Sequence, residues 1–216
     1  MQIIDGPFNA AYGDFSRLGV VHIRLRESLP DQLMLRLQGG SFGAFRSLLS
    51  HSPNLKNGDA FVAYEGSRTD GSFENPLRYS RDNLTANLTR RVSAATTYGF
   101  RFNGGSNDFY SLGQLPLDMA VAGQLDRFGY IDPTDGGHVR TGTLGAYFCH
   151  EGAHGEDTWR LDAFAARSLF DPYLNFKFFL NNPVSGDGSN STIHGCKKAP
   201  TYNMSGRKTL ARCKGC

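Results

Sequence analysis

No segment of this sequence approaches 18 uninterrupted apolar residues, so the chain offers no candidate for a transmembrane helix. It also lacks a basic stretch followed by an apolar stretch at Met1, and we therefore expect no signal peptide. Hydrophobic residues make up 39% of the 216 residues and charged residues 20%. That balance is too polar for a helical membrane protein and too apolar for a chain that is disordered throughout.

Aliphatic residues are modest in number, whereas glycine and aromatic residues are abundant. There are 26 glycines, and aromatic residues reach 12% of the chain. Glycine permits the tight turns that join strands, and aromatic side chains suit the pleated surface of a sheet. The composition therefore predicts many short strands joined by tight turns, in one large domain or two small ones.

The net charge of +3 arises from the C-terminal end of the sequence. Residues 190–216 contain six basic residues and no acidic one, whereas residues 1–189 contain 17 basic and 20 acidic residues. The main part of the sequence therefore has no basic excess of the kind that nucleic-acid binding requires. We expect no nucleic-acid partner.

Residues 189–216 form an atypical basic tail that also differs in its use of residue types. The tail holds three of the four cysteines and four of the six lysines, while the preceding part uses arginine for 15 of its 17 basic residues. This change favours a frameshift or a foreign read-through, with a disordered tail of the same gene as the alternative. Six like charges and few apolar residues predict that residues 190–216 are disordered.

Alternation of apolar and polar residues with a period of two dominates the rest of the chain and indicates β-strands. Within residues 96–103, for example, Tyr98, Phe100 and Phe102 share one face of the expected strand. We expect seven strands that pair in sequence order as an antiparallel meander. Their expected ranges are 32–39, 43–52, 59–67, 82–91, 96–104, 140–149 and 157–168.

The segments between these strands alternate in length. Short turns are expected at residues 53–58, 92–95 and 151–157, and longer loops at residues 68–80 and 104–139. Short turns at one end of the strands and long loops at the other are typical of outer-membrane β-barrels, and strands of this length suit a tilted crossing of a bilayer. The pattern favours a transmembrane barrel, with a soluble β-sandwich as the alternative.

The N-terminal segment carries three short motifs, a Gly-Pro, a Tyr-Gly and a Gly-Val-Val. They are formed by Gly6, Pro7, Tyr12, Gly13, Gly19, Val20 and Val21. These motifs resemble the end of the plug domain of TonB-dependent outer-membrane receptors, just before the first barrel strand. Residues 35–42 resemble the first barrel hairpin of that family, and residues 61–75 resemble a strand that runs into an outer loop.

The resemblance covers residues 3–188 and implies an all-β fold. This fold is an antiparallel β-meander that forms part of a transmembrane β-barrel, with a short plug remnant at the N-terminus. Residues 1–28 match the end of the plug, and residues 29–188 match the first seven or eight barrel strands. A complete barrel of this family has 22 strands, so we expect the chain to be a fragment of such a receptor.

The same resemblance implies energy-coupled uptake of a large, scarce nutrient across the outer membrane of a Gram-negative-type bacterium. The implied substrate is a metal chelate, such as a siderophore, or an oligosaccharide. The implied partners are outer-membrane lipid and the TonB complex, the latter through segments outside this sequence. No catalytic residue and no cofactor is expected, and the alternative reading is a soluble β-sandwich that binds carbohydrate.

One motif points to an enzyme instead. His150, Glu151 and His154 spell the HExxH signature of zinc proteases. That signature needs a helix, which places both imidazoles on one face, whereas here it joins two expected strands and contains Gly152. A hairpin turn is the favoured interpretation, and a zinc hydrolase is the weaker one.

A second weak metal candidate lies in the tail, where His194, Cys196, Cys213 and Cys216 have a spacing that resembles a zinc site with three cysteines and one histidine. Its first half is incomplete, and a chance product of the tail is the favoured interpretation. We therefore expect no metal site.

The long loop at residues 104–139 carries the candidate substrate-contact residues. Aromatic and polar side chains on a long outer loop suit a binding surface, or they pack the loop against its neighbours. The candidates are Asn107, Asp108, Phe109, Tyr110, Arg127, Phe128, Tyr130 and Asp132. A short helix is expected within residues 116–129.

Overall fold

A computed structural model of the chain describes residues 2–5, 19–22, 26–152, 158–175, 177, 180–181, 187–190 and 193–205. The protein is all-β, with 61% of its residues in strands and one five-residue helix, α1 (Leu117–Val121), in the part described. No helix among the described residues has the length and hydropathy of a membrane span. The expectation of an all-β fold is confirmed.

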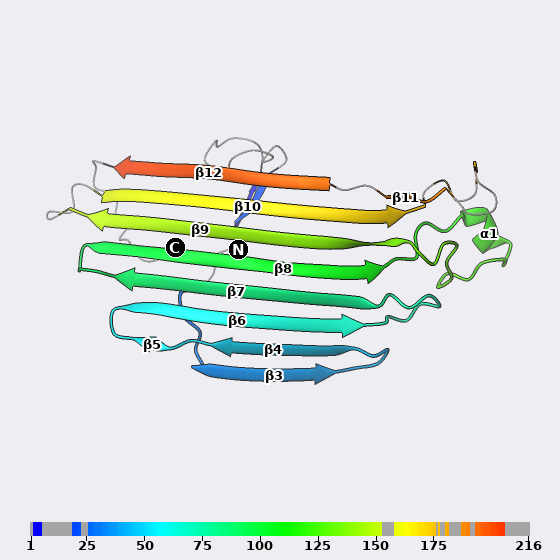
Figure 1. Ribbon diagram of the computed structural model, residues 1–216, viewed down its shortest axis with the longest axis horizontal. Coiled ribbons are helices and arrows are strands. Elements are labelled where there is room, and N and C mark those ends of the chain that lie inside the picture. The colour runs from blue at the N-terminus through cyan, green and yellow to red at the C-terminus, as the bar shows by residue number, and fades with distance from the viewer. Residues whose placement is uncertain are drawn as a thin grey trace.

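One large antiparallel sheet contains eight long strands (Figure 1). They are β3 (Leu33–Gly39), β4 (Phe45–His51), β6 (Gly58–Thr69), β7 (Tyr79–Arg91), β8 (Thr96–Tyr110), β9 (Gly136–Glu151), β10 (Thr158–Leu174) and β12 (Ile193–Ser205). Two short strands, β5 (Asn54–Leu55) and β11 (Ser189–Asn190), pair with β6 and β10. A separate two-stranded sheet pairs β1 (Gln2–Asp5) with β2 (Gly19–His22).

The long strands follow one another across the sheet in sequence order, and every pairing is antiparallel. The expected meander of seven strands is therefore confirmed, with β12 as an additional neighbour of β10. Within the described residues, β3 and β12 are the two edges and do not pair with each other, so the sheet is not closed.

The connections differ in length between the two ends of the strands. Turns of four to six residues join β4 to β6, β7 to β8 and β9 to β10 at one end. The other end carries the loops at residues 70–78, 111–135 and 175–188 (Figure 1). We call these ends the turn rim and the loop rim. Only the turn between β3 and β4 is short on the loop rim, and the predicted segregation of connection lengths is confirmed.

Several strands are longer than the sequence predicts, and the longest extensions lie towards the loop rim. β8 continues to Tyr110 instead of residue 104, β9 begins at Gly136 instead of residue 140, and β10 continues to Leu174. The extensions of β8 and β9 are rich in Gly, Asn, Ser and Asp, which have low strand propensity. Pairing with both neighbouring strands supplies the backbone hydrogen bonds, so the tertiary context overrides the weak local preference.

The expectation of a disordered tail is wrong for residues 193–205. This segment is β12, and all 13 of its residues pair with β10 in an antiparallel register that runs from Phe170 and Ile193 to Thr158 and Ser205. The charge and composition of the tail predict that it cannot form a hydrophobic core of its own. An edge strand does not need one, because backbone hydrogen bonds to a single neighbouring strand hold it in place. Residues 206–216 lie outside the described part.

The register assigns the side chains of the large sheet to two faces, because residues directly opposite each other share a face. One continuous row runs through Leu35, Leu49, Tyr64 and Leu84, and the next runs through Phe102 and Leu144. We call the face that carries these rows the apolar face. Its large apolar members include Leu33, Leu35, Leu37, Leu49, Val62, Tyr64, Leu84, Leu88, Tyr98, Phe100, Phe102, Leu144, Phe148, Trp159 and Leu161.

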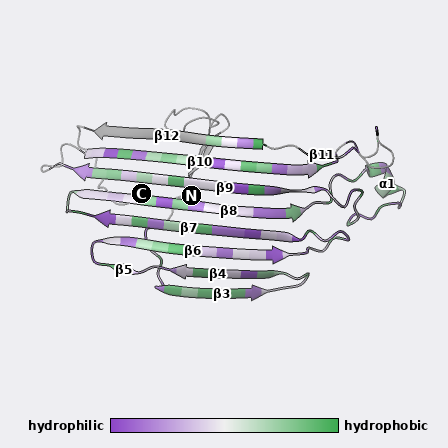
Figure 2. Ribbon diagram, in the orientation of Figure 1, coloured by the Kyte–Doolittle hydropathy of each residue, from purple (hydrophilic) through white to green (hydrophobic). Residues whose placement is uncertain are grey.

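The opposite face carries polar side chains, and we call it the polar face. Its members include Arg46, Glu65, Asn83, Thr85, Asn87, Thr89, Arg101, Asn103, Asn107, Thr141, Thr143, Arg160 and Asp162. The hydropathy colours alternate along the central strands and become hydrophilic towards the loop ends of β7 and β8 (Figure 2).

Burial is reversed relative to a water-soluble sheet. Leu35 on the apolar face is 65% exposed and Leu144 is 55% exposed, whereas Thr89 and Asn87 on the polar face are only 1% and 4% exposed. A soluble β-sandwich buries its apolar face against a second sheet. No described element covers the apolar band of this sheet in that way.

Candidate functional site

The polar face near the turn rim contains a compact hydrogen-bonded group. The hydroxyl groups of Thr89 and Tyr147 lie 2.8 Å apart, and the Asn87 amide Nδ2 lies 3.5 Å from Thr89 Oγ1. The guanidinium of Arg101 lies 5.1 Å and that of Arg160 5.8 Å from the centre of the Tyr147 ring. Cation–π contacts of this kind help to hold the Tyr147 ring in place.

Gly99 makes this arrangement possible. It lies directly opposite Tyr147 in the register of β8 and β9, and a Cβ atom at Gly99 would overlap the Tyr147 ring. The aromatic ring occupies the space that a side chain on β8 would otherwise fill. The polar face is therefore packed closely at this point, although it contains no large apolar cluster.

The segment that leads into β3 runs along the polar face. The backbone oxygen of Glu27 accepts a hydrogen bond of 3.0 Å from Asn87 Nδ2, and its carboxylate lies 3.4 Å from the Arg91 guanidinium. Arg91 also pairs with Asp59 at 2.5 Å. Because these ion pairs are partly exposed, they contribute little stability, but they fix the path of the chain.

Ser52 is the buried part of this attachment, since it is only 3% exposed. Its hydroxyl accepts a hydrogen bond of 3.0 Å from the Leu29 N–H and donates one of 2.8 Å to the Ala60 carbonyl. Replacing Ser52 by alanine leaves the Leu29 N–H without this acceptor. We expect a loss of about 1–3 kcal/mol in the free energy of unfolding, measured by urea titration in detergent.

Ser50 provides the matched control for Ser52. It is 2% exposed, but its hydroxyl has no hydrogen-bond partner among the described residues. Replacing Ser50 by alanine removes an unsatisfied buried group, so the free energy of unfolding is expected to stay equal or to rise. Equal losses in the two variants would contradict the attachment described for Ser52.

The predicted contact residues of β8 do not form one surface. The assignment of Asn107, Asp108, Phe109 and Tyr110 to a loop is wrong, because all four belong to β8. Their side chains alternate between the two faces, with Asn107 and Phe109 on the polar face and Asp108 and Tyr110 on the apolar face. Only the first two therefore face the same side as the attached N-terminal segment.

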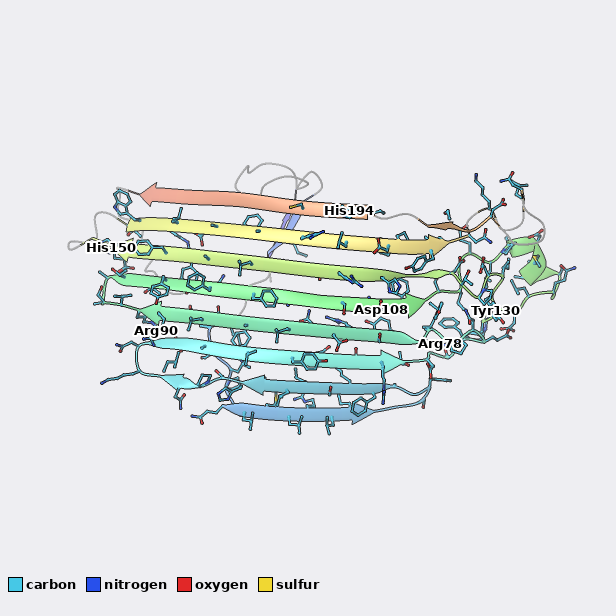
Figure 3. The ribbon with its side chains drawn as sticks, viewed as in Figure 1. Arg78, Arg90, Asp108, Tyr130, His150 and His194 are labelled. Carbon is cyan, nitrogen blue, oxygen red and sulfur yellow. The ribbon has the colours of Figure 1, made fainter. Side chains whose placement is uncertain are left out.

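On the apolar face, this part of the loop rim is polar. Asp108 pairs with the imidazole Nδ1 of His138, which lies directly opposite it on β9. The Arg78 guanidinium lies 5.7 Å from the centre of the Tyr110 ring. Figure 3 shows Arg78, Asp108 and Tyr130 at the loop rim, at the opposite end of the sheet from Arg90 and His150.

The remaining candidates lie in the loop between β8 and β9, where α1 confirms the expected short helix in part. Phe128 packs against Phe73 of the neighbouring loop with ring centres 6.0 Å apart, and the Arg127 guanidinium lies 4.8 Å from the Phe128 ring centre. Glu74 N–H donates a hydrogen bond of 3.2 Å to the Phe128 oxygen. These contacts favour the alternative in which the loop residues pack against one another, while Arg127 itself stays exposed.

A polar cluster that the sequence did not reveal lies at the base of this loop. The Asn175 backbone N–H donates to Asp135 Oδ1 at 2.8 Å, and Asn175 Nδ2 donates to Asp132 Oδ2 at 2.9 Å. Asp132 Oδ1 also accepts hydrogen bonds from the N–H and hydroxyl of Thr134. We call Asp132, Asp135 and Asn175 the loop-base cluster.

The pKa values of the two carboxylates in the loop-base cluster are shifted in opposite directions. Burial, together with the negative charge of Asp132, raises the pKa of Asp135 above its usual value, against a backbone hydrogen bond from Asn175 that lowers it. Burial also tends to raise the pKa of Asp132, but the hydrogen bonds from Thr134 and Asn175 outweigh it, so the pKa is lowered. Among the described residues, neither carboxylate forms a salt bridge with a basic side chain.

The HExxH motif does not form a helix in the described residues. His150 and Glu151 are the last residues of β9, so their side chains point to opposite faces of the sheet. His150 Nδ1 lies 2.8 Å from Thr96 Oγ1, and His154 lies outside the described residues. A zinc-bound water held by His150 would not be reached by Glu151 in this geometry.

The tail candidates are separated in a similar way. His194 and Cys196 share one face of β12, Cys196 is an exposed free thiol, and Cys213 and Cys216 lie outside the described residues. Cys149 on β9 is 2% exposed and is disulfide-bonded. In the part of the chain described, no three His, Cys, Asp or Glu side chains are placed to hold a metal ion.

The motifs that resemble the end of a plug are described only in part. Gly19, Val20 and Val21 form β2, which pairs with β1. Gly6, Pro7, Tyr12 and Gly13 lie outside the described residues. The resemblance to the plug of TonB-dependent receptors therefore stays a prediction at these positions.

Comparisons with known proteins leave the fold and the site as the basis for a functional assignment. No model of a known protein family, no curated protein and no solved structure matches the chain.

Proposed function

We propose that this chain forms part of the wall of a transmembrane β-barrel, and that the barrel is that of a TonB-dependent receptor. The observation that carries the proposal is the reversed burial of the sheet. An apolar band crosses seven neighbouring strands and is exposed, while Ser50, Asn87 and Thr89 on the opposite polar face are buried near the turn rim. Contiguous apolar surfaces of this extent mark contacts with lipid or protein. Contact with lipid explains why the apolar band runs across all seven strands at a similar height.

Strand length supports the same proposal. β8, β9 and β10 have 15, 16 and 17 residues, whereas a tilted strand crosses a bilayer with about 9–11 residues. The excess lies at the loop rim, where the apolar face becomes polar at Asp108, His138 and Arg140. The strands thus extend beyond the apolar band on the side of the long loops.

Two further features agree with a receptor of this family. The segment at residues 26–29 is attached to the polar face, as expected for a chain that passes from the barrel interior into the first wall strand. The edges β3 and β12 each have one side without a paired strand in the described part. Unpaired backbone groups are costly in hydrocarbon, so the proposal requires further strands to close the wall.

In this proposal the barrel takes up a large nutrient, such as a metal chelate or an oligosaccharide, and is coupled to the TonB complex. Asn107 and Phe109 are substrate-contact candidates because they lie on the polar face at the loop rim. Arg127 and Tyr130, in the loop between β8 and β9, also remain candidates. Asp108 and Tyr110 lie on the opposite face and are not proposed as contacts.

The proposal is tested by the behaviour of the purified chain with and without detergent. We expect the chain to need detergent or lipid to stay dispersed, because the apolar face is exposed. We also expect neither heat-modifiable gel mobility nor channel conductance, because the two edges remain unpaired.

Two other outcomes would contradict the proposal in different ways. A monodisperse, folded protein in plain buffer would favour the soluble carbohydrate-binding alternative. Conductance together with heat-modifiable mobility would show a small barrel that closes by itself.

A further inference from the structure

Four exposed arginines lie on the apolar face, on the loop-rim side of the apolar band. The register places Arg68 of β6, Arg140 of β9 and Arg167 of β10 on this face. Arg78, directly before β7, contacts the ring of Tyr110, which shares the face. We call these four arginines the arginine belt. None of them forms an ion pair with a residue in the described part of the chain.

The acidic side chains of the long strands on the same face do not pair with the arginine belt. Asp82 accepts a hydrogen bond from the Tyr64 hydroxyl, and Asp108 pairs with the imidazole of His138. Asp171 lies opposite His138 and forms no ion pair with a basic side chain among the described residues. An exposed guanidinium without a carboxylate partner keeps its N–H donors available for another anion.

The position of the belt relative to the apolar band favours a lipid as the source of that anion. On β10, Ala165 lies opposite Leu144 of the band, and Arg167 follows two residues, or about 7 Å, closer to the loop rim. Arg140 lies opposite Leu169, which is two residues further in the same direction. An arginine at the edge of an apolar surface lays its aliphatic stem on that surface and extends its guanidinium into the polar layer beyond.

We propose that the arginine belt binds the phosphate groups of anionic lipids that surround the apolar face. This inference rests on the proposed function, because it requires that the apolar face meets lipid. A guanidinium matches two phosphate oxygens with two parallel hydrogen bonds. Lipid is the favoured occupant because it covers the apolar band and supplies the phosphate at its border, whereas a water-soluble anion leaves the band exposed.

The test compares two lipids that have identical acyl chains and differ in the charge of their head groups. The full chain is refolded in a nonionic detergent, and either dioleoylphosphatidylglycerol or dioleoylphosphatidylcholine is added to the micelles. The amount of lipid that elutes with the chain on gel filtration gives the affinity. We expect phosphatidylglycerol to bind more tightly than phosphatidylcholine, and sodium chloride to reduce the difference by screening.

Substitutions in the belt assign the preference to its arginines. Arg140→Gln and Arg167→Gln should each lower the affinity for phosphatidylglycerol about five-fold and leave the affinity for phosphatidylcholine unchanged. Arg81→Gln is the matched control, because Arg81 is an exposed arginine at the same rim but on the polar face. Arg167→Lys keeps the charge and should retain most of the affinity, which separates loss of charge from misfolding.

Quenching of Trp159 by a detergent with a brominated acyl chain distinguishes failure of this inference from failure of the proposed function. If Trp159 is quenched but the two lipids bind alike, or if Arg81→Gln loses as much affinity as Arg167→Gln, the lipid site is refuted and the membrane wall stands. If Trp159 is not quenched, the proposed function fails and this inference fails with it. Displacement of phosphatidylglycerol by inorganic phosphate would also overturn the inference, because it would assign the belt to a free anion.

Discussion

Replacing Leu144 by arginine is expected to destabilise the protein in detergent micelles by up to about 2–4 kcal/mol, which is the cost of an arginine on the lipid-facing side of a complete barrel near the bilayer centre. Leu144 lies on the apolar face of β9, is 55% exposed and sits opposite Phe102 and Ala165. In water an exposed leucine is replaced by arginine at almost no cost. The size of the effect therefore reports which solvent the apolar face meets, and urea unfolding in detergent micelles measures it.

Thr143 is the matched control for Leu144. It is the preceding residue on β9, is also exposed, and lies on the polar face. Thr143→Arg adds the same side chain to the same strand at the same depth, and it should change the free energy of unfolding by less than about 1 kcal/mol. If the two variants lose equal stability, or if Thr143→Arg loses more, the assignment of the two faces is wrong.

Replacing Gly99 by alanine is expected to cost about 1–3 kcal/mol, as overpacking in a tightly packed region does. A Cβ atom at this position overlaps the Tyr147 ring, which is held by the Thr89 hydroxyl and by two guanidinium groups. The ring is not free to move aside without losing these contacts. The change is measured by urea unfolding in detergent.

Gly142 on β9 is the control for this substitution, because no atom lies within 4 Å of a Cβ built there. Gly142→Ala should be neutral or slightly stabilising, since alanine loses less backbone entropy than glycine on folding. In a Tyr147→Ala background, Gly99→Ala should lose most of its cost. A full cost in that background would show that Tyr147 is not the obstacle.

The sequence predicts the order and pairing of the strands better than their ends. Around Phe100 and Phe102, apolar and polar residues alternate because one face of the strand carries apolar side chains and the other carries polar ones. This alternation predicts the strand. Towards the loop rim the environment of both faces is polar, so the alternation disappears at Gly104 and Gly105 although pairing continues to Tyr110. Periodicity therefore locates the apolar band, and only the pairing of neighbouring strands sets the strand ends.

The tail shows the limit of composition as a guide. Residues 193–205 have little alternation and contain Pro200, yet each residue finds a partner on β10. Proline is tolerated on an edge strand because its missing N–H need not face a neighbour. No property of the tail alone indicates this pairing, since the partner strand lies more than twenty residues earlier in the chain.

The loop-base cluster was predicted only through Asp132, which is one of the candidate contacts in the long loop. Its partners are Asp135, three residues later, and Asn175, which is 40 residues beyond Asp135 and directly follows a strand. Residue types as common as Asp and Asn give no signal at such separations. Two adjacent strands bring them together, so the cluster appears only once the register of β9 and β10 is known.

The most direct test of the central claim uses Trp159, the single tryptophan of the chain. It lies on the apolar face of β10 near the turn rim and is 51% exposed. In micelles of a detergent that carries bromine on its acyl chain, we expect strong quenching of its fluorescence and little quenching by iodide in the water. Strong quenching by iodide with no effect of the brominated detergent would contradict the claim that this face of the sheet meets an apolar solvent.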